Sequence, residues 1–129
     1  MTTGEASLSI RSARPGDAAG VTRIYNHYIG HSVATFEIRP VSEPIVARRM
    51  AGILERFPWL VAVADERLLG YAYATAWKPR EAYAHTVETT IYLDHELCGR
   101  GLGERLYRRL LTELEAMNVH AALGGIALP

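Results

Sequence analysis

Hydrophobic and polar residues follow two periods along the chain, and the change of period predicts the secondary structure. Runs typical of β-strands cover residues 7–13, 32–38, 59–64, 68–77 and 86–94. Stretches 14–31, 41–58 and 102–117 space their apolar residues three and four apart, which predicts helices. The order of these elements is not a regular βαβ repeat. We therefore expect an α+β (mixed α/β) fold in one domain, residues 1–129.

Prolines and polar turn residues mark where several of these elements begin and end. Pro15 and Asp17 open the first predicted helix, and Ser42 is a candidate N-cap for the second, with Pro44 in its first turn. Pro58 should end that second helix. The tripeptide at 65–67 joins two strand-like runs, which predicts an antiparallel hairpin.

Composition narrows the class of protein without identifying a function. The chain has 129 residues, with 14 basic and 14 acidic side chains. This balance gives no electrostatic reason to expect nucleic acid or a membrane surface as partner. One cysteine forms no internal disulfide, and the first residues lack the features of a signal peptide, so we expect a cytoplasmic protein.

Three alternating glycines, Gly99, Gly101 and Gly103, precede the leucine-rich helix of residues 102–117. A helix start presents unpaired N–H groups and a positive dipole end, and glycines let an anion approach them closely. The same glycines also suit a plain turn, so their pattern alone leaves phosphate binding and a structural turn open. A Walker loop is absent, and Glu104 replaces the last glycine of a dinucleotide fingerprint.

The strand before the glycines carries an acid in its middle. Alternation places Val87, Thr89, Ile91 and Leu93 on one face, and Thr86, Glu88, Thr90 and Tyr92 on the other. Glu88 is either an ordinary solvent-facing glutamate or a carboxylate placed to accept a proton from whatever the anion carries.

The strand, the glycine turn and the helix together resemble motif A of the GCN5-related N-acetyltransferases, whose core is (Arg/Gln)-x-x-Gly-x-(Gly/Ala). Gly101 and Gly103 fit this core, whereas Cys98 stands where arginine or glutamine is usual. The stretches IYNHYI, ATFE, PWLVAVAD, GYAYA, WKPREAY and TVETTIYL resemble, in order, the phosphinothricin and methionine-sulfone N-acetyltransferase branch.

This resemblance implies a mostly antiparallel twisted sheet flanked by helices, with acetyl-CoA as co-substrate and no metal. Glu88 matches the proposed general base of the family. The backbone of Ile91, Tyr92 and Leu93 would pair with the pantetheine arm of the cofactor. The amides of six consecutive residues would bind its pyrophosphate: Gly99, Arg100, Gly101, Leu102, Gly103 and Glu104.

The resemblance also implies an acceptor that is a small amino-acid-like amine, and a homodimer. Lys78 or Arg80 would suit a carboxylate on the acceptor, but both also read as solvated loop charges. Phe36 and Tyr83 would line the acceptor pocket. They could equally be aromatic residues of the core or the surface. The alternative function is a catalytically incompetent cofactor-binding or interaction module of the same ancestry, because the family continues beyond the last run, residues 119–128, with a helix and two strands. We expect either a truncated product or an omitted tail.

Two weaker patterns are set aside. His27 and His31 stand four apart on the first helix, but no third metal ligand is evident. Cys98 and His95 form no ordered nucleophile pattern, and a free thiol beside the glycines explains Cys98 better.

Overall fold

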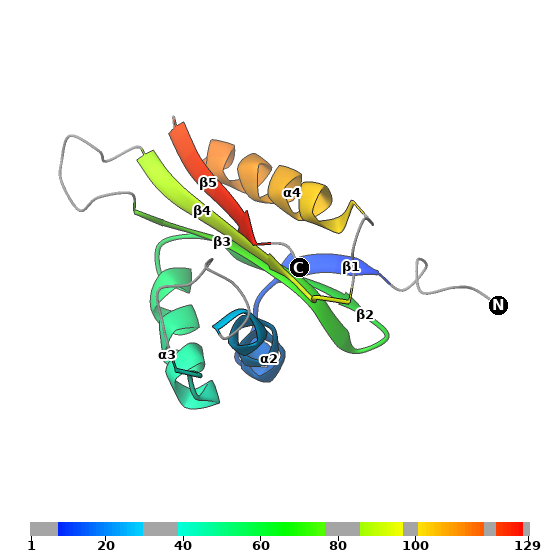
Figure 1. Cartoon of the computed structure of the whole chain (residues 1–129). Helices are drawn as coiled ribbons and strands as arrows, with labels where there is room; N and C mark the ends of the chain where they lie inside the picture. The colour runs from blue at the N-terminus through cyan, green and yellow to red at the C-terminus, as the bar shows by residue number, and fades with distance from the viewer. Residues whose placement is uncertain (1–7, 30–38, 77–85, 97–100, 118–120, 128–129) are drawn as a thin grey trace.

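The computed structural model describes residues 8–29, 39–76, 86–96, 101–117 and 121–127 (Figure 1). Its elements in chain order are β1 (Ser9–Ser12), the 3₁₀ turn η1 (Pro15–Asp17), α2 (Ala18–Ile29), α3 (Glu43–Leu54), β2 (Trp59–Ala64), β3 (Arg67–Ala76), β4 (Thr86–Leu93), α4 (Leu102–Ala116) and β5 (Ala121–Ala127). The predicted α+β class is confirmed. The expected strand at 32–38 lies outside the described residues.

The five strands form one sheet in the order β1-β2-β3-β4-β5. Strands β1 to β4 are antiparallel to one another in this order, and β5 runs parallel to β4. The predicted hairpin is β2–β3, turned by Asp65 and Glu66, which both adopt positive φ. A bulge at Ala62/Val63 shifts the register of this hairpin, so that Leu68 and Tyr71 both face the same side of the sheet.

Helices cover both faces of the sheet, α2 and α3 on one side and α4 on the other (Figure 1). The α4 face is aliphatic: Leu102, Leu106, Leu110 and Leu114 pack on strand residues that include Ile91. The opposite face is rich in aromatic rings from β2, β3, β4 and α2. The apolar stripe predicted for α4 is thus explained by core packing.

Two helix boundaries differ from the sequence prediction in their detail. Pro15–Asp17 forms a 3₁₀ turn before α2, and the Asp17 carboxylate there accepts hydrogen bonds from the Arg14 N–H and the Arg11 guanidinium. Ser42 is the N-cap residue of α3, but its side chain makes no capping hydrogen bond. The helix ends at Leu54, before Pro58, where the Phe57 N–H bonds to the Ile53 carbonyl.

Candidate functional site

Glu88 is the third of the eight residues of β4 and is exposed. Its neighbours Val87 and Ile91 belong to the core on α4, whereas Tyr92 belongs to the core on α2 and α3. Because side chains alternate along a strand, Glu88 faces the side that α2 and α3 cover. The predicted alternation of β4 is therefore confirmed, and it places the carboxylate at one end of the aromatic face.

A row of polar and aromatic side chains leads from Glu88 across the sheet. Glu88 pairs in register with Thr75, Thr90 pairs with Tyr73, and Tyr73 pairs with Trp59. Tyr73 therefore lies diagonally opposite Glu88. The rings of Trp59 and Tyr73 are stacked with their centroids 4.2 Å apart.

A negative and a positive side chain act on the pKa of the Tyr73 hydroxyl. Burial raises the pKa of Tyr73, a hydrogen bond with Thr90 opposes that shift, the Glu88 carboxylate raises the pKa further, and Arg49 of α3 lowers it. The phenol is thus neutral at physiological pH and lies within electrostatic reach of both Glu88 and Arg49.

A cavity of about 70 Å³ opens beside this row, between the sheet and the two helices. Its lining consists of Val21 and Tyr25 from α2, Val46, Arg49 and Ile53 from α3, and Trp59, Tyr71 and Tyr73 from the sheet. Sequence reasoning did not identify this cavity or its lining residues, because they come from four elements that no local motif connects.

The second part of the site is the start of α4. Gly101 is the N-cap residue and adopts φ of +70°, a left-handed conformation that favours glycine. A Cβ on Gly101 would meet no heavy atom within 4 Å, so the space outside the helix start is open among the described residues. Gly101 has no side chain with which to cap this end, and among the described residues no other side chain is recorded as capping the first-turn N–H groups of Leu102, Gly103 and Glu104.

Gly103 has a packing role that the motif alone did not reveal. A Cβ there would lie 3.3 Å from Cδ1 of Leu93, so the glycine lets α4 approach the end of β4 closely. Gly103 is buried, whereas Glu104 is exposed and forms an ion pair with Arg108 one turn later. Of the glycines predicted to bind phosphate, Gly99 and the adjacent Arg100 lie outside the described residues.

The backbone of β4 is paired on both sides for most of its length. Its parallel register with β5 runs from Thr86–Ala121 to Tyr92–Ala127, and Leu93 alone of the strand extends beyond it. The resemblance predicts that Ile91, Tyr92 and Leu93 pair with pantetheine. For Ile91 and Tyr92 this pairing would require β5 to move away from β4 at that end.

A charge network fixes the end of β4, just before the glycine turn. The Asp94 carboxylate is 1% exposed and accepts hydrogen bonds from Arg23 at 2.8 Å, from Arg67 at 2.9 Å and from the Glu96 N–H at 2.9 Å. Burial alone would raise the pKa of Asp94, but these donors hold it far below its usual value.

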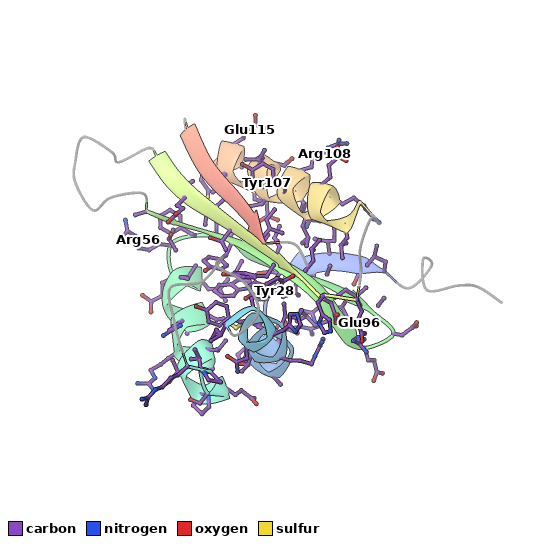
Figure 2. All side chains as sticks on the ribbon, viewed as in Figure 1. Tyr28, Arg56, Glu96, Tyr107, Arg108 and Glu115 are labelled. Carbon is purple, nitrogen blue, oxygen red and sulfur yellow. The ribbon has the colours of Figure 1, made fainter. Side chains whose placement is uncertain are left out.

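Tyr28 adds a further link between α2 and the end of β4. Tyr28, labelled in Figure 2, projects from α2 toward the sheet. Its hydroxyl donates to the Leu93 carbonyl at 2.6 Å. The sequence pattern gave no role to Tyr28 or Asp94, although Tyr28 lies within the stretch IYNHYI and Asp94 directly follows TVETTIYL. Glu88 on β4 is a diagonal neighbour of Tyr73, which lines the cavity, and the same strand ends near the start of α4.

Comparison with known proteins identifies the family to which this arrangement belongs. The sequence model of the acetyltransferase (GNAT) family matches residues 21–126. The chain belongs to this family. The GNAT match covers α2 to β5 and so includes Glu88, the start of α4 and the cavity.

Individual relatives agree with the branch that the motifs indicated. The GNAT chain is 38% identical over 122 residues to a phosphinothricin N-acetyltransferase of Streptomyces viridochromogenes, covering 95% of this chain and 67% of the relative. A phosphinothricin acetyltransferase of Sinorhizobium meliloti, solved in complex with acetyl-CoA, has a TM-score of 0.80 at 36% identity, covering 85% of this chain and 60% of that one.

A third relative, an acetyltransferase of Salmonella typhimurium solved with its cofactor acetyl-CoA, gives a TM-score of 0.87 at 31% identity, covering 92% of this chain and 69% of that one. The GNAT chain thus spans between 60% and 69% of the length of these three relatives.

The remaining predicted site residues lie where the structure describes nothing. Phe36, Lys78, Arg80 and Tyr83 are outside the described residues, as is His31 of the histidine pair. Among the described residues, no three histidine, cysteine or acidic side chains gather as metal ligands would. No helix in the described part of the chain is long and apolar enough to span a membrane.

Proposed function

We propose that this GNAT chain transfers the acetyl group of acetyl-CoA directly to the amine of a small amino-acid-like substrate. The observation that carries the proposal is that one strand, β4, presents Glu88 near an aromatic cavity and, at Leu93, packs against the glycine-led start of α4. Acetyl-CoA bound to the relatives, and the names of those relatives, support this reading.

The spacing along β4 suits a long, extended cofactor. Leu93 comes five positions after Glu88, which corresponds to about 17 Å of strand. A pyrophosphate held by the amides at the start of α4 would leave the pantetheine arm to run back along β4 toward Glu88. The thioester carried by that arm supplies the activated acetyl group.

Glu88 acts as the general base in this proposal. The acceptor arrives largely as an ammonium ion and gives its proton to the Glu88 carboxylate, directly or through water. The free amine then attacks the thioester carbonyl, a C–N bond forms, and the C–S bond breaks to release the thiol of CoA. A positioned base of this kind contributes on the order of 10²–10⁴-fold in rate.

The acceptors named by the relatives define the substrate class to test first. Phosphinothricin and methionine sulfone or sulfoximine are amino acids with a polar, oxygen-bearing side-chain end. Lys78, Arg80, Tyr83 and Phe36 remain our proposed contacts for such an acceptor. A cytoplasmic homodimer remains part of the proposal.

The alternative proposal is a chain that binds CoA or a partner without catalysing transfer. It is favoured by the β5 pairing that occupies the β4 edge as far as Tyr92. In that case acetyl-CoA would bind weakly or at α4 alone, and no amine would be acetylated.

Acetylation of an amine by the parent protein separates these proposals, and replacement of Glu88 by glutamine then tests the general base. Glu88→Gln should lower kcat at least tenfold and leave the affinity for acetyl-CoA almost unchanged, because the amide keeps the shape but accepts no proton. Its activity should recover as pH rises toward the pKa of the amine, since the free amine no longer needs a base. Glu55→Gln, an exposed change at the end of α3, is the matched control. Equal kcat in both variants across neutral pH would remove Glu88 from the mechanism.

A further inference from the structure

The cavity beside Tyr73 contains a buried hydrogen-bond donor that no described group satisfies. Trp59 is 4% exposed, and its indole Nε1 is buried without a hydrogen-bond partner. Buried indole N–H groups ordinarily find an acceptor, because leaving them unpaired after desolvation is unfavourable. Trp59 also lines the cavity, and an acceptor atom there would reach its N–H once the side chains around Nε1 shift to admit it.

The walls of the cavity combine apolar surface with one positive charge. Tyr25, Tyr71 and Tyr73 contribute rings, and Val21, Val46 and Ile53 contribute aliphatic surface. Arg49 is exposed and lines the same cavity from α3. The Trp59 N–H and the Arg49 cation beside apolar walls suit a ligand group that has an apolar stem and a terminal oxygen. They suit a purely hydrocarbon group poorly.

The position of the cavity relative to Glu88 matches the size of an amino acid. Glu88 is on β4, Tyr73 is its diagonal neighbour on β3, and Trp59 is the partner of Tyr73 on β2. Two strand spacings across the sheet and two residues along it, about 12 Å in all, therefore separate the Glu88 backbone from that of Trp59. An amino acid whose amine lies at Glu88 can place the end of its side chain between Trp59 and Arg49.

The volume of the cavity limits what that end can be. A water molecule needs roughly 10–15 Å³ on this measure of volume, so about 70 Å³ admits a group of a few heavy atoms. This is enough for a sulfonyl, phosphinyl or carboxylate group.

From this geometry we infer that Arg49 and the Trp59 indole N–H bind the terminal oxygens of the acceptor side chain and set the substrate preference of this chain. The inference rests on the proposed acetyl transfer for its acceptor and names the side-chain subsite. It predicts that discrimination between acceptors depends on these two residues, whereas proton removal depends on Glu88.

Methionine and its sulfone are the probes that isolate this effect, because they differ only by the two oxygens on sulfur. Both are offered to the protein with acetyl-CoA, and kcat/KM is measured for each. The ratio of sulfone to methionine should fall about tenfold or more in Arg49→Gln and in Trp59→Phe. Arg48→Gln is the matched control: it removes an adjacent exposed arginine that does not line the cavity, and it should leave the ratio unchanged.

A binding measurement keeps the inference testable apart from catalysis. In a Trp77→Phe background Trp59 is the sole tryptophan, so its fluorescence reports on the cavity. Methionine sulfone, titrated with and without CoA, should change that fluorescence and saturate, and Arg49→Gln should weaken the binding about tenfold while Arg48→Gln does not. The melting temperature of each variant shows that it is folded.

The outcomes separate the inference from the proposed function. Sulfone binding that depends on Arg49, without acetylation of either probe, would overturn the proposed activity and support the subsite. Acetylation of both probes with ratios that neither Arg49→Gln nor Trp59→Phe changes would overturn the subsite and support the activity. A Trp59 signal that sulfone does not change, or changes no more than methionine does, would also overturn the subsite.

Discussion

Asp94 carries a buried charge whose contribution to stability can be predicted from its contacts. Asp94→Asn keeps the shape of the side chain but removes its charge. Three donors then face a neutral amide: Arg23, Arg67 and the Glu96 N–H. Hydrogen bonds to an ionised group contribute about 1.5–3 kcal/mol each. The asparagine oxygen retains part of this hydrogen-bond energy. Arg23 and Arg67 are 44% and 54% exposed, so water hydrates their guanidinium groups once the charge of Asp94 is gone.

The expected loss is therefore about 2 kcal/mol, less than the 3–5 kcal/mol typical of breaking a fully buried pair. For a chain of this length it corresponds to a melting temperature lower by roughly 6–10 °C. Glu96→Gln is the matched control, since it removes the same charge from the same cluster (Figure 2). Glu96 is 64% exposed, so its loss should cost about 0–1 kcal/mol.

The pH dependence supplies a second test of Asp94. Its pKa in the folded protein lies far below the ordinary value of 3.8, so its contribution is complete above the unfolded pKa and is lost as pH falls toward the folded one. In urea unfolding followed by circular dichroism, the difference between parent and Asp94→Asn should stay constant from pH 7 to about 5 and shrink below about 4. Equal losses in Asp94→Asn and Glu96→Gln, or a difference that is as large at pH 3 as at pH 7, would refute this reasoning.

Two further predictions concern glycines. Gly101→Val should weaken acetyl-CoA binding at least tenfold by calorimetry, since its side chain would occupy the open space at the start of α4. The positive φ should cost only about 1–2 kcal/mol of stability. Unchanged affinity for acetyl-CoA would contradict the predicted anion site. Gly70→Ala should lower the free energy of unfolding, measured in urea, by about 1–3 kcal/mol, because its Cβ would lie 2.8 Å from Leu93 Cδ2. Gly52→Ala in α3 is the control and should raise it by about 0.5–1 kcal/mol. A loss in both variants would contradict the packing described for Gly70.

The parts of the fold that depend on local patterns were predictable from the sequence. The β2–β3 hairpin followed from two strand-like runs around residues 65–67, and the core face of α4 followed from its leucine spacing. The face on which Glu88 lies followed from the period of two in β4. In each case the information is contained within one or two adjacent elements.

The parts that depend on contacts between distant elements were not predictable. Asp94 and Arg23 are 71 residues apart, and their ion pair has no counterpart in local spacing. The bulge at Ala62/Val63 changes which side chains face α2, and Gly70 beside it is a weak sequence signal because glycine in a strand has several explanations. The cavity of Arg49 and Trp59 needs α2, α3, β2 and β3 in place. The role of Gly103 in packing against Leu93 was likewise visible only in three dimensions.

The most direct test of the account is to incubate the protein with acetyl-CoA and either phosphinothricin or methionine sulfone, and to follow free thiol and N-acetylated product together. The account predicts that both appear in equal amounts, that product carries the acetyl group on its amine, and that Glu88→Gln slows both at least tenfold. Binding of acetyl-CoA without an acetylated amine would contradict it and would favour a chain that binds the cofactor without transferring its acetyl group.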